Sequence, residues 1–145
     1  MSPTARVRHA EPPSLALILD ADGVTKLAHR DRRVREMLRQ EVTERGGRIV
    51  VPWVAVIQAR ADRRAMGAID LALEAADALA GVDRRRTVLA SDLLRETRTT
   101  DVPDALVAVE ALLLAPSVVI TSDPGDLRRL LDADPRGRRV EVWPI

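Results

Sequence analysis

Short, continuous apolar runs alternate along this chain with longer stretches whose apolar positions recur at helical spacing. Short apolar runs bounded by charged or turn residues are typical of strands buried on both faces of a parallel sheet. The predicted strands are LALIL (15–19), RIVVP (48–52), GVDR (81–84, the weakest pattern), SVVITS (117–122) and RRVEVW (138–143). Strands alternating with helices predict an α/β fold, a three-layer α/β/α arrangement around a mostly parallel central sheet of four to five strands.

The helical stretches fall between these strands. In the clearest of them, Val34, Leu38 and Val42 share one predicted apolar face. The Gly46-Gly47 pair is expected to end that helix, because glycine adopts the left-handed conformation that closes helices. The predicted helices span residues 22–29, 31–45, 53–64, 67–80, 87–97, 102–114 and 124–132.

Length and composition predict one small domain. At 145 residues the chain has a usual length for a single domain, which we place at 15–145 after a disordered lead-in at 1–14. The hydrophobic share is 46%, with two tryptophans and neither Phe nor Tyr, so the core is expected to be aliphatic.

Charge and cysteine content exclude several classes of protein. The net charge of +1 gives no global field for nucleic acids, although Lys26 is the only lysine and arginine supplies the other basic side chains. The sequence has no cysteine, which excludes disulfides, thiolate metal sites and a cysteine nucleophile and favours a cytoplasmic location. No apolar run reaches the length of a membrane span, so we expect no membrane partner.

Acidic residues gather where the predicted strands end. They are Asp20 and Asp22 after the first strand, Asp101 and Asp104 at the start of the 102–114 helix, and Asp123 and Asp126 after strand 117–122. Sites in parallel sheets form at the carboxyl ends of strands. Clustered carboxylates repel one another unless a cation lies among them, and Mg²⁺ and Mn²⁺ prefer oxygen ligands. The pattern predicts a Mg²⁺ or Mn²⁺ site.

Helix capping is the competing explanation for several of these residues. Asp123, followed by Pro124 and Asp126, has the pattern of a helix N-terminus. Asp101 is placed to cap the predicted helix at 102–114. Asp20 is harder to explain as a cap alone, because a carboxylate directly after a buried run is costly without a partner.

The motif LDADGV (19–24) resembles the Asp-x-Asp-Gly motif of haloacid dehalogenase-like phosphatases. That resemblance implies that Asp20 is a nucleophile and Asp22 its acid/base partner. It covers only about six residues, a weak signal by itself. VVITSDPGD supplies only one of the two later strand motifs that this family needs, and Lys26 is misplaced for the family's basic residue.

A second resemblance covers nearly the whole chain. LILDADGVTKLA, IVVPWVAVIQA, TDVPDALVAVEA and VVITSDPGDLRRL resemble, in order and spacing, the motifs of the PIN domain, the fold of VapC-type toxins and related Mg²⁺-dependent ribonucleases. The resemblance implies a PIN-like domain with Asp20, Asp104 and Asp123 as catalytic metal ligands and Asp126 as a frequent companion. Asp22 and Asp101 become supplementary groups.

One position departs from the family pattern. Gln58 stands where PIN domains usually have a metal-site glutamate, on the helix after the second strand. A carboxamide offers an oxygen but no negative charge and no carboxylate base. A catalytically weakened PIN-fold binding module is therefore an alternative to the enzyme.

The PIN resemblance implies hydrolysis of RNA phosphodiester bonds with Mg²⁺ or Mn²⁺, leaving 5′-phosphate and 3′-hydroxyl ends. Thr121 or Ser122 adds a hydroxyl in this interpretation, and nearby arginines offset the repulsion between RNA and the acidic site. The candidates for RNA binding are Arg60, Arg63, Arg64 and the DRRR tract (83–86). The resemblance also implies a cognate antitoxin as partner and, by analogy, a homodimer.

Overall fold

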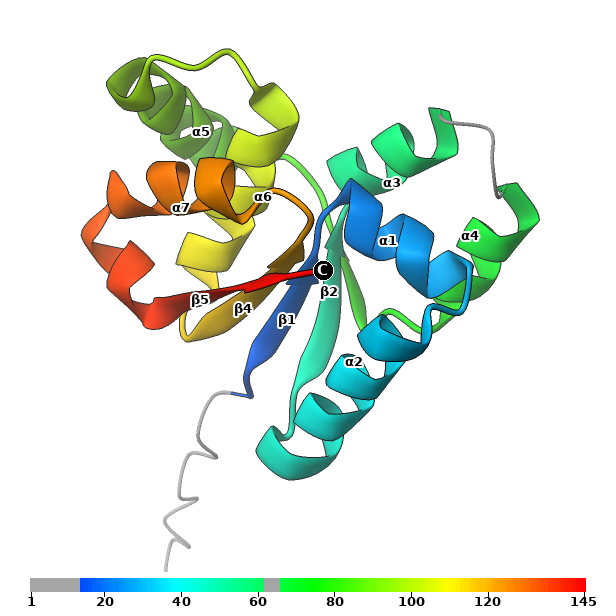
Figure 1. The fold of residues 1–145 in the computed structure, drawn as a ribbon. Coiled ribbons are helices and arrows are strands. Elements are labelled where there is room, and N and C mark those ends of the chain that lie inside the picture. The colour runs from blue at the N-terminus through cyan, green and yellow to red at the C-terminus, as the bar shows by residue number, and fades with distance from the viewer. Residues whose placement is uncertain (1–13, 62–65) are drawn as a thin grey trace, which may run out of the picture.

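A parallel five-stranded sheet forms the centre of the molecule (Figure 1). The computed structural model describes residues 14–61 and 66–145. The strand order is β3-β2-β1-β4-β5, and every neighbouring pair is parallel. The strands are β1 (Ala16–Leu19), β2 (Arg48–Pro52), β3 (Ala78–Ala80), β4 (Ser117–Thr121) and β5 (Val140–Pro144).

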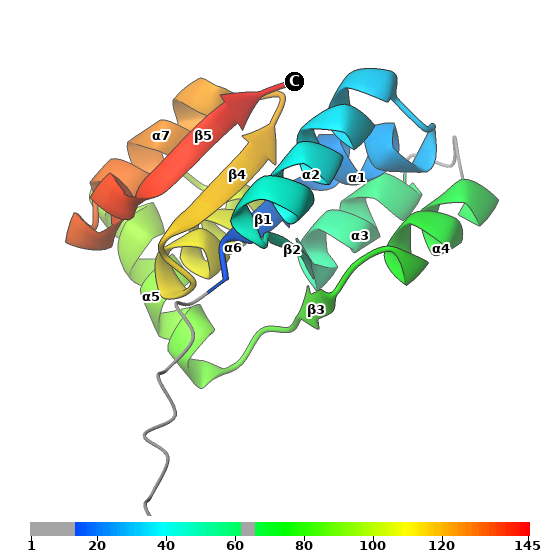
Figure 2. The same cartoon turned by 90° about the horizontal axis from the view of Figure 1, so that it is seen from below.

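Helices cover both faces of the sheet, which confirms the predicted three-layer α/β/α fold (Figures 1 and 2). One face carries α1 (Ala21–Ala28), α2 (Arg32–Arg45), α3 (Trp53–Ala61) and α4 (Met66–Glu74). The other carries α5 (Arg84–Thr97), α6 (Val102–Leu113) and α7 (Pro124–Asp132), followed by the short 3₁₀ helix η1 (Pro135–Arg139). No helix in the described residues is both long and apolar enough to cross a membrane.

The central strand explains why its sequence is continuously apolar. Ala16 and Ile18 face the core under α5, α6 and α7, whereas Leu17 and Leu19 face the core under α1 to α4. All four side chains are fully buried, because both faces of β1 are covered. A strand in this position has no solvent side and therefore no polar alternation.

The strand order reverses between β1 and β4. From β1 the chain passes to β2 and β3 on one side, then crosses to β4 and β5 on the other. The helices after β1 and β4 consequently leave the sheet on opposite faces, and in parallel sheets such a point commonly has a crevice at the carboxyl ends of the strands, so we call this place the crevice. Asp20 follows β1 at this point, and Ser122 and Asp123 follow β4.

The third strand was predicted at the wrong place. Residues 81–84 lie outside β3, which is formed by Ala78–Ala80, and the helix predicted over 67–80 ends at Glu74. Asp83 instead caps α5, accepting a hydrogen bond of 2.8 Å from the backbone N–H of Arg86. The Ala/Leu-rich sequence of this region is compatible with either a helix or a strand. Ala78–Ala80 forms a strand because it pairs with β2 at the edge of the sheet, with Val50 opposite Ala78.

Smaller corrections concern helix faces and ends. Val42 is 42% exposed, and Glu41 is buried in its place, so the inner face of α2 comprises Val34, Leu38 and Glu41. Gly46 closes α2 in the left-handed conformation (φ 63°), as predicted. The last strand begins two residues later than predicted because 135–139 forms η1, and part of the predicted 53–64 helix lies outside the described residues.

Candidate metal centre

Three carboxylates from two helices converge at the crevice. Asp104 lies in the first turn of α6, Asp123 precedes α7, and Asp126 lies in the first turn of α7. One carboxylate oxygen from each lies within 4.8 Å of the others. Both α6 and α7 begin at the same edge of the sheet. Asp104 consequently lies beside Asp123 and Asp126, although about twenty positions separate them in sequence.

Helix capping positions this cluster rather than competing with it. The side chain of Asp101 caps α6 by accepting a hydrogen bond of 3.0 Å from the N–H of Asp104. The side chain of Asp123 caps α7 in the same way, accepting a bond of 3.4 Å from the N–H of Asp126. The positive ends of both helix dipoles thus point at the carboxylates and offset part of their mutual repulsion.

Asp20 lies beside the cluster in a different environment. It is only 7% exposed, and its Oδ1 accepts a hydrogen bond of 2.8 Å from the N–H of Gly23, which makes it the cap of α1. Its negative charge is near enough to raise the pKa of Asp104, although Asp20 is outside the group of three. The crevice thus brings together all four residues predicted as metal ligands, three of them at the closest range.

Gly23 has a packing role that explains its place in the LDADGV motif. A Cβ at this position would lie 3.2 Å from the Ile120 carbonyl oxygen and 3.3 Å from the Leu19 Cβ. The first turn of α1 therefore sits closely on the ends of β1 and β4, and its N–H is held against Asp20. The glycine follows from this close approach and needs no phosphatase chemistry.

Hydroxyl groups support the acidic residues. Thr121 is fully buried, accepts a hydrogen bond of 2.9 Å from the N–H of Asp123, and lies with its hydroxyl against the Asp20 carboxylate. The exposed Ser122 donates a hydrogen bond to Asp22, which ties the segment after β4 to the first turn of α1. Both hydroxyls predicted from the sequence therefore lie at the crevice, and each orients an aspartate.

The clustering raises two pKa values. Burial, with the charges of Asp101, Asp20, Asp123 and Asp126 adding to it, raises the pKa of Asp104 to about 7. Burial also raises the pKa of Asp20, and the hydrogen bonds from Thr121 and from the Gly23 N–H offset only part of that effect. Carboxyl groups that resist ionisation beside other carboxylates are typical of sites that bind a cation.

The donor set fits a hard divalent cation. All of the grouped side chains are carboxylates, the ligands that Mg²⁺ and Mn²⁺ prefer. In an octahedral Mg²⁺ site, oxygens on opposite sides of the ion are about 4.2 Å apart. Oxygens on neighbouring positions are closer, at about 3 Å, so three oxygens within 4.8 Å of one another can share one ion after side-chain rotations draw them together. The acidic cluster is consistent with a metal site.

Of the three arginines predicted to bind RNA on the helix after β2, the structure describes one. Arg60 forms an ion pair of 3.1 Å with Asp70 of α4, and Arg63 and Arg64 lie outside the described residues. Gln58 is exposed on α3, and within the described ranges its amide makes no hydrogen bond.

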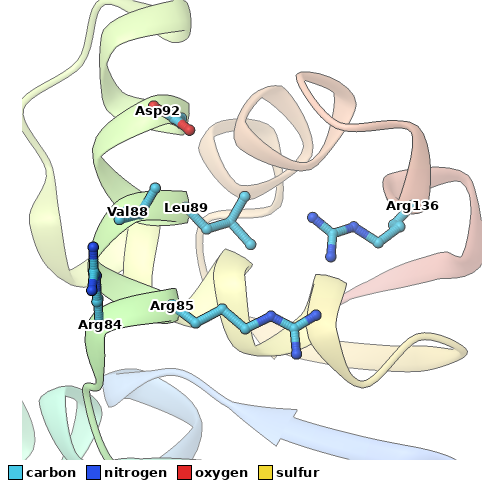
Figure 3. Close-up of a pocket in the computed structure, with 6 residues that line it drawn as sticks. All are labelled: Arg84, Arg85, Val88, Leu89, Asp92 and Arg136. Carbon is cyan, nitrogen blue, oxygen red and sulfur yellow. The ribbon is translucent and has the colours of Figure 1, made fainter.

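The DRRR tract divides into two parts. Arg86 is committed to the interior of the α5–α6 packing, where it pairs with Glu110. Arg84 and Arg85 are exposed and line an open pocket of about 520 Å³ with Val88, Leu89, Asp92 and Arg136 (Figure 3). No residue of the acidic cluster lines this pocket, so we do not assign it to the metal centre.

One residue at the acidic crevice was missed by the sequence reasoning. Arg129 lines a small pocket together with Thr99, Asp101, Asp104, Asp126 and Leu130. The available signal was its position three residues after Asp126, which places both on one face of α7. Among the residues of 14–61 and 66–145 that line this pocket, Arg129 is the only cation.

Comparison with known proteins identifies the fold. No family model matches the sequence, and no curated protein matches it. A chain of VapBC2 from Rickettsia felis, solved bound to a DNA fragment from its promoter, is 12% identical and superposes with a TM-score of 0.67 over 89% of this chain and 99% of that one. A chain of VapBC-1 from nontypeable Haemophilus influenzae is 16% identical, with a TM-score of 0.64 over 90% and 98%. At these identities the likeness establishes the fold, and this chain has the PIN-like α/β fold that its sequence predicted.

Proposed function

We propose that this protein is a Mg²⁺- or Mn²⁺-dependent ribonuclease that hydrolyses RNA phosphodiester bonds and serves as the toxin of a type II toxin–antitoxin pair. The observation that carries the proposal is the convergence of Asp104, Asp123 and Asp126 beside the buried Asp20, in the crevice of a PIN-like fold. Because Asp123 and Asp126 are exposed, a strand of RNA can approach the acidic cluster from solvent.

In this proposal the acidic residues bind the cation and neighbouring groups hold them in position. Asp20, Asp104 and Asp123 would hold the cation, with Asp126 as their companion and Asp20 reaching it from a buried position. When bound, the cation supplies Lewis-acid stabilisation of the charge that develops on the phosphoryl oxygens during hydrolysis. Thr121 and the N–H of Gly23 fix Asp20, and Ser122 fixes Asp22, so the acidic surface keeps its shape as the substrate enters.

The alternatives differ in what they require of particular residues. A weakened PIN-fold binding module is favoured only by Gln58, whose amide brings no charge to the site. A phosphatase needs the Asp20 carboxylate open to attack a substrate, whereas Asp20 is 7% exposed and engaged by the N–H of Gly23. The geometry therefore supports the metal-dependent ribonuclease better than either alternative.

Partners follow from the same proposal. The two similar structures named above are VapBC proteins. For this chain we propose a small antitoxin encoded next to its gene, whose tail covers the acidic crevice, and a homodimer as the assembly. Light scattering after size-exclusion chromatography tests the dimer, and a monomer at micromolar concentration would refute it.

The decisive experiment is cleavage of mixed cellular RNA with Mg²⁺, with Mn²⁺ and with EDTA, by the wild-type protein and by the Asp20→Asn variant. We expect cleavage that needs the metal and is lost in the variant. Asp31→Asn is the matched control, because Asp31 caps α2 through a bond of 2.9 Å from the Val34 N–H but lies outside the acidic cluster. Cleavage that survives both EDTA and Asp20→Asn would rule out the proposal.

A further inference from the structure

Arg129 is the basic residue of the acidic pocket. It lies on α7, one turn after Asp126, and the described residues that line its pocket include three aspartates and no other basic side chain. A nucleic acid entering this pocket brings a further negative charge toward carboxylates that already repel one another. A guanidinium at this place is therefore the one group in the pocket lining that attracts a phosphate by itself.

The backbone of α5 holds Arg129 in position. One terminal nitrogen of the guanidinium donates a hydrogen bond of 2.5 Å to the carbonyl oxygen of Thr97, the last residue of α5. The negative end of the α5 dipole favours a cation at this end of the helix. The chain turns directly afterwards, at Arg98, with φ 56°. The contact fixes the guanidinium without using a carboxylate.

The adjacent Arg128 gives a direct contrast. Its three nitrogens all bond within the protein, to Asp132, to the Val140 carbonyl oxygen and to the Gly137 carbonyl oxygen, at 3.0, 2.9 and 2.7 Å. Arg129 makes one such bond, and in the part of the chain that the structure describes no carboxylate lies within ion-pair distance of it. Arg128 is a structural residue, whereas most N–H donors of Arg129 remain available to a ligand.

We propose that Arg129 binds a phosphate of the RNA strand next to the carboxylate cluster and so positions the substrate; this inference rests on the proposed ribonuclease function. The planar guanidinium offers paired N–H donors that match two phosphate oxygens. Its hydrogen bond to Thr97 holds the guanidinium at the pocket that Asp104 and Asp126 also line, before RNA arrives. The carboxylates hold the metal, and Arg129 supplies the contact that draws the backbone of the substrate toward it.

Three substitutions separate this role from a structural one. Arg129→Gln keeps a donor for the Thr97 carbonyl but removes the charge, Arg129→Lys keeps the charge, and Arg129→Ala removes both. Binding of a short fluorescent single-stranded RNA of mixed sequence is measured by anisotropy with Mg²⁺, in the Asp20→Asn background to keep the RNA intact. We expect the Gln and Ala variants to bind about tenfold more weakly and the Lys variant to bind within about threefold of the parent.

Salt dependence gives a second readout. Removing one phosphate contact is expected to lower the slope of log affinity against log salt concentration by about 0.7 for a single strand. Arg95→Gln is the matched control, because Arg95 is exposed on α5, pairs with Asp92, and is absent from the acidic pocket. We expect the slope to change in Arg129→Gln and to stay unchanged in Arg95→Gln.

The outcomes distinguish the two proposals. RNA cleavage by the wild-type protein, combined with equal RNA affinity and salt slope in the parent and in Arg129→Gln, overturns the role of Arg129 and leaves the ribonuclease standing. Arg129-dependent RNA binding without metal-dependent cleavage overturns the ribonuclease alone. Weak binding by Arg129→Ala with normal binding by Arg129→Gln assigns the residue to tying α7 to α5, which also refutes the inference.

Discussion

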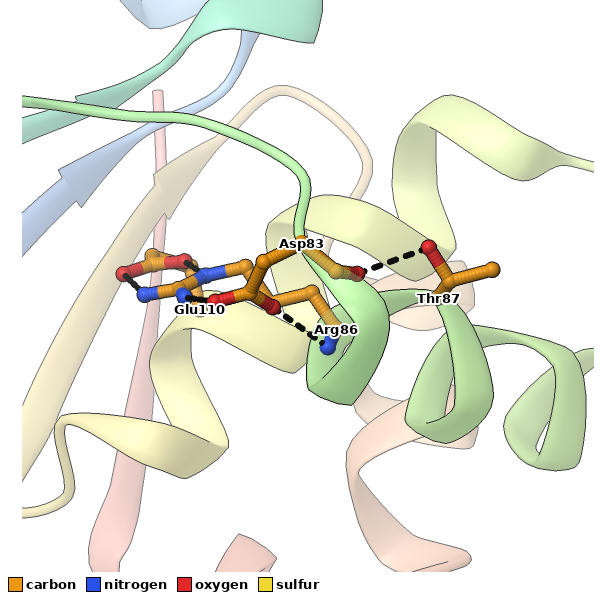
Figure 4. Close-up of polar contacts among 4 residues, drawn as sticks. All are labelled: Asp83, Arg86, Thr87 and Glu110. Atoms are coloured by element: carbon orange, nitrogen blue, oxygen red, sulfur yellow. Dashed lines mark hydrogen bonds and ion pairs between the residues drawn. The ribbon is translucent and has the colours of Figure 1, made fainter.

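Two carboxylates on α6 have opposite surroundings. Glu110, near the end of the helix, is 3% exposed and receives two hydrogen bonds from Arg86, at 2.7 Å from Nε and 3.0 Å from a terminal nitrogen (Figure 4). Asp104, in the first turn, is half-buried and lies among other aspartates, and within the described residues it forms no ion pair. The same helix therefore carries one carboxylate that is neutralised by the protein and one that is left for a ligand.

The contrast separates structural from functional charge. Asp83 also pairs with Arg86, at 2.7 Å, so the guanidinium is enclosed between α5 and α6 (Figure 4). The hydrogen bonds to Glu110 raise the pKa of Arg86, which keeps the guanidinium charged. At the other end of α6, burial and like charges raise the pKa of Asp104 to about 7. Repulsion among these aspartates lowers the stability of the folded protein unless a cation binds there.

The largest expected effect comes from breaking the neutralised pair. Arg86→Ala leaves Glu110 buried without its cation, and we expect the free energy of unfolding to fall by about 3–5 kcal/mol, measured by urea denaturation. Arg85→Ala is the control, because Arg85 is exposed and its loss should cost less than about 0.5 kcal/mol. The double variant Arg86→Met, Glu110→Leu should recover most of the loss. If Arg86→Ala is as stable as the control, the pair has no structural role.

Metal binding is the next largest effect and acts at the other carboxylate. A cation that binds only the folded state stabilises it by about 2.7 kcal/mol at a hundred times its Kd. We expect Mg²⁺ or Mn²⁺ to raise the unfolding temperature of the wild-type protein and to do so far less in Asp104→Asn. Asp31→Asn, which removes a carboxylate outside the acidic cluster but keeps an oxygen to cap α2, should keep the full metal effect. An equal shift in all three proteins would show that the cation binds elsewhere.

The pH dependence of stability without metal tests the repulsion itself. Because the pKa of Asp104 is about 7 in the folded protein and near 3.8 in the unfolded chain, the folded state holds a proton that the unfolded chain releases. Stability is therefore greatest below about pH 4 for this group and declines until about pH 7, and the raised pKa of Asp20 acts in the same direction. Since Asp104 is half exposed, we expect a total decline of about 1–2 kcal/mol.

Urea denaturation in EDTA between about pH 5 and about pH 8 measures this decline. Asp104→Asn should flatten the curve, and Asp92→Asn, at an exposed site on α5, should leave it unchanged. A wild-type protein that gains stability with rising pH across this range would contradict the assigned direction.

The sequence predicted the fold and the position of the site more completely than the site's geometry. The apolar runs of β1, β2 and β4 and the caps before α6 and α7 lie close to where the sequence placed them, because both are local signals. The third strand was misplaced since Ala78–Ala80 gains its strand conformation only from pairing with β2. Arg129 was missed because the carbonyl that holds it, Thr97, is thirty-two residues away in sequence.

The smallest expected effect concerns Gln58, the position at which the acidic set departs from the PIN pattern. Gln58→Glu adds a carboxylate on α3, and because Gln58 is exposed its environment imposes little desolvation cost. If its side chain reaches the cation, we expect the Kd for Mn²⁺ to fall about fivefold, equivalent to about 1 kcal/mol, in calorimetric titration. Ile57→Glu places the same charge on the neighbouring exposed residue of α3, which points in a different direction around the helix, and should change the Kd far less. Equal tightening in both variants would mean that general charge attracts the metal and that Gln58 has no specific place at the site.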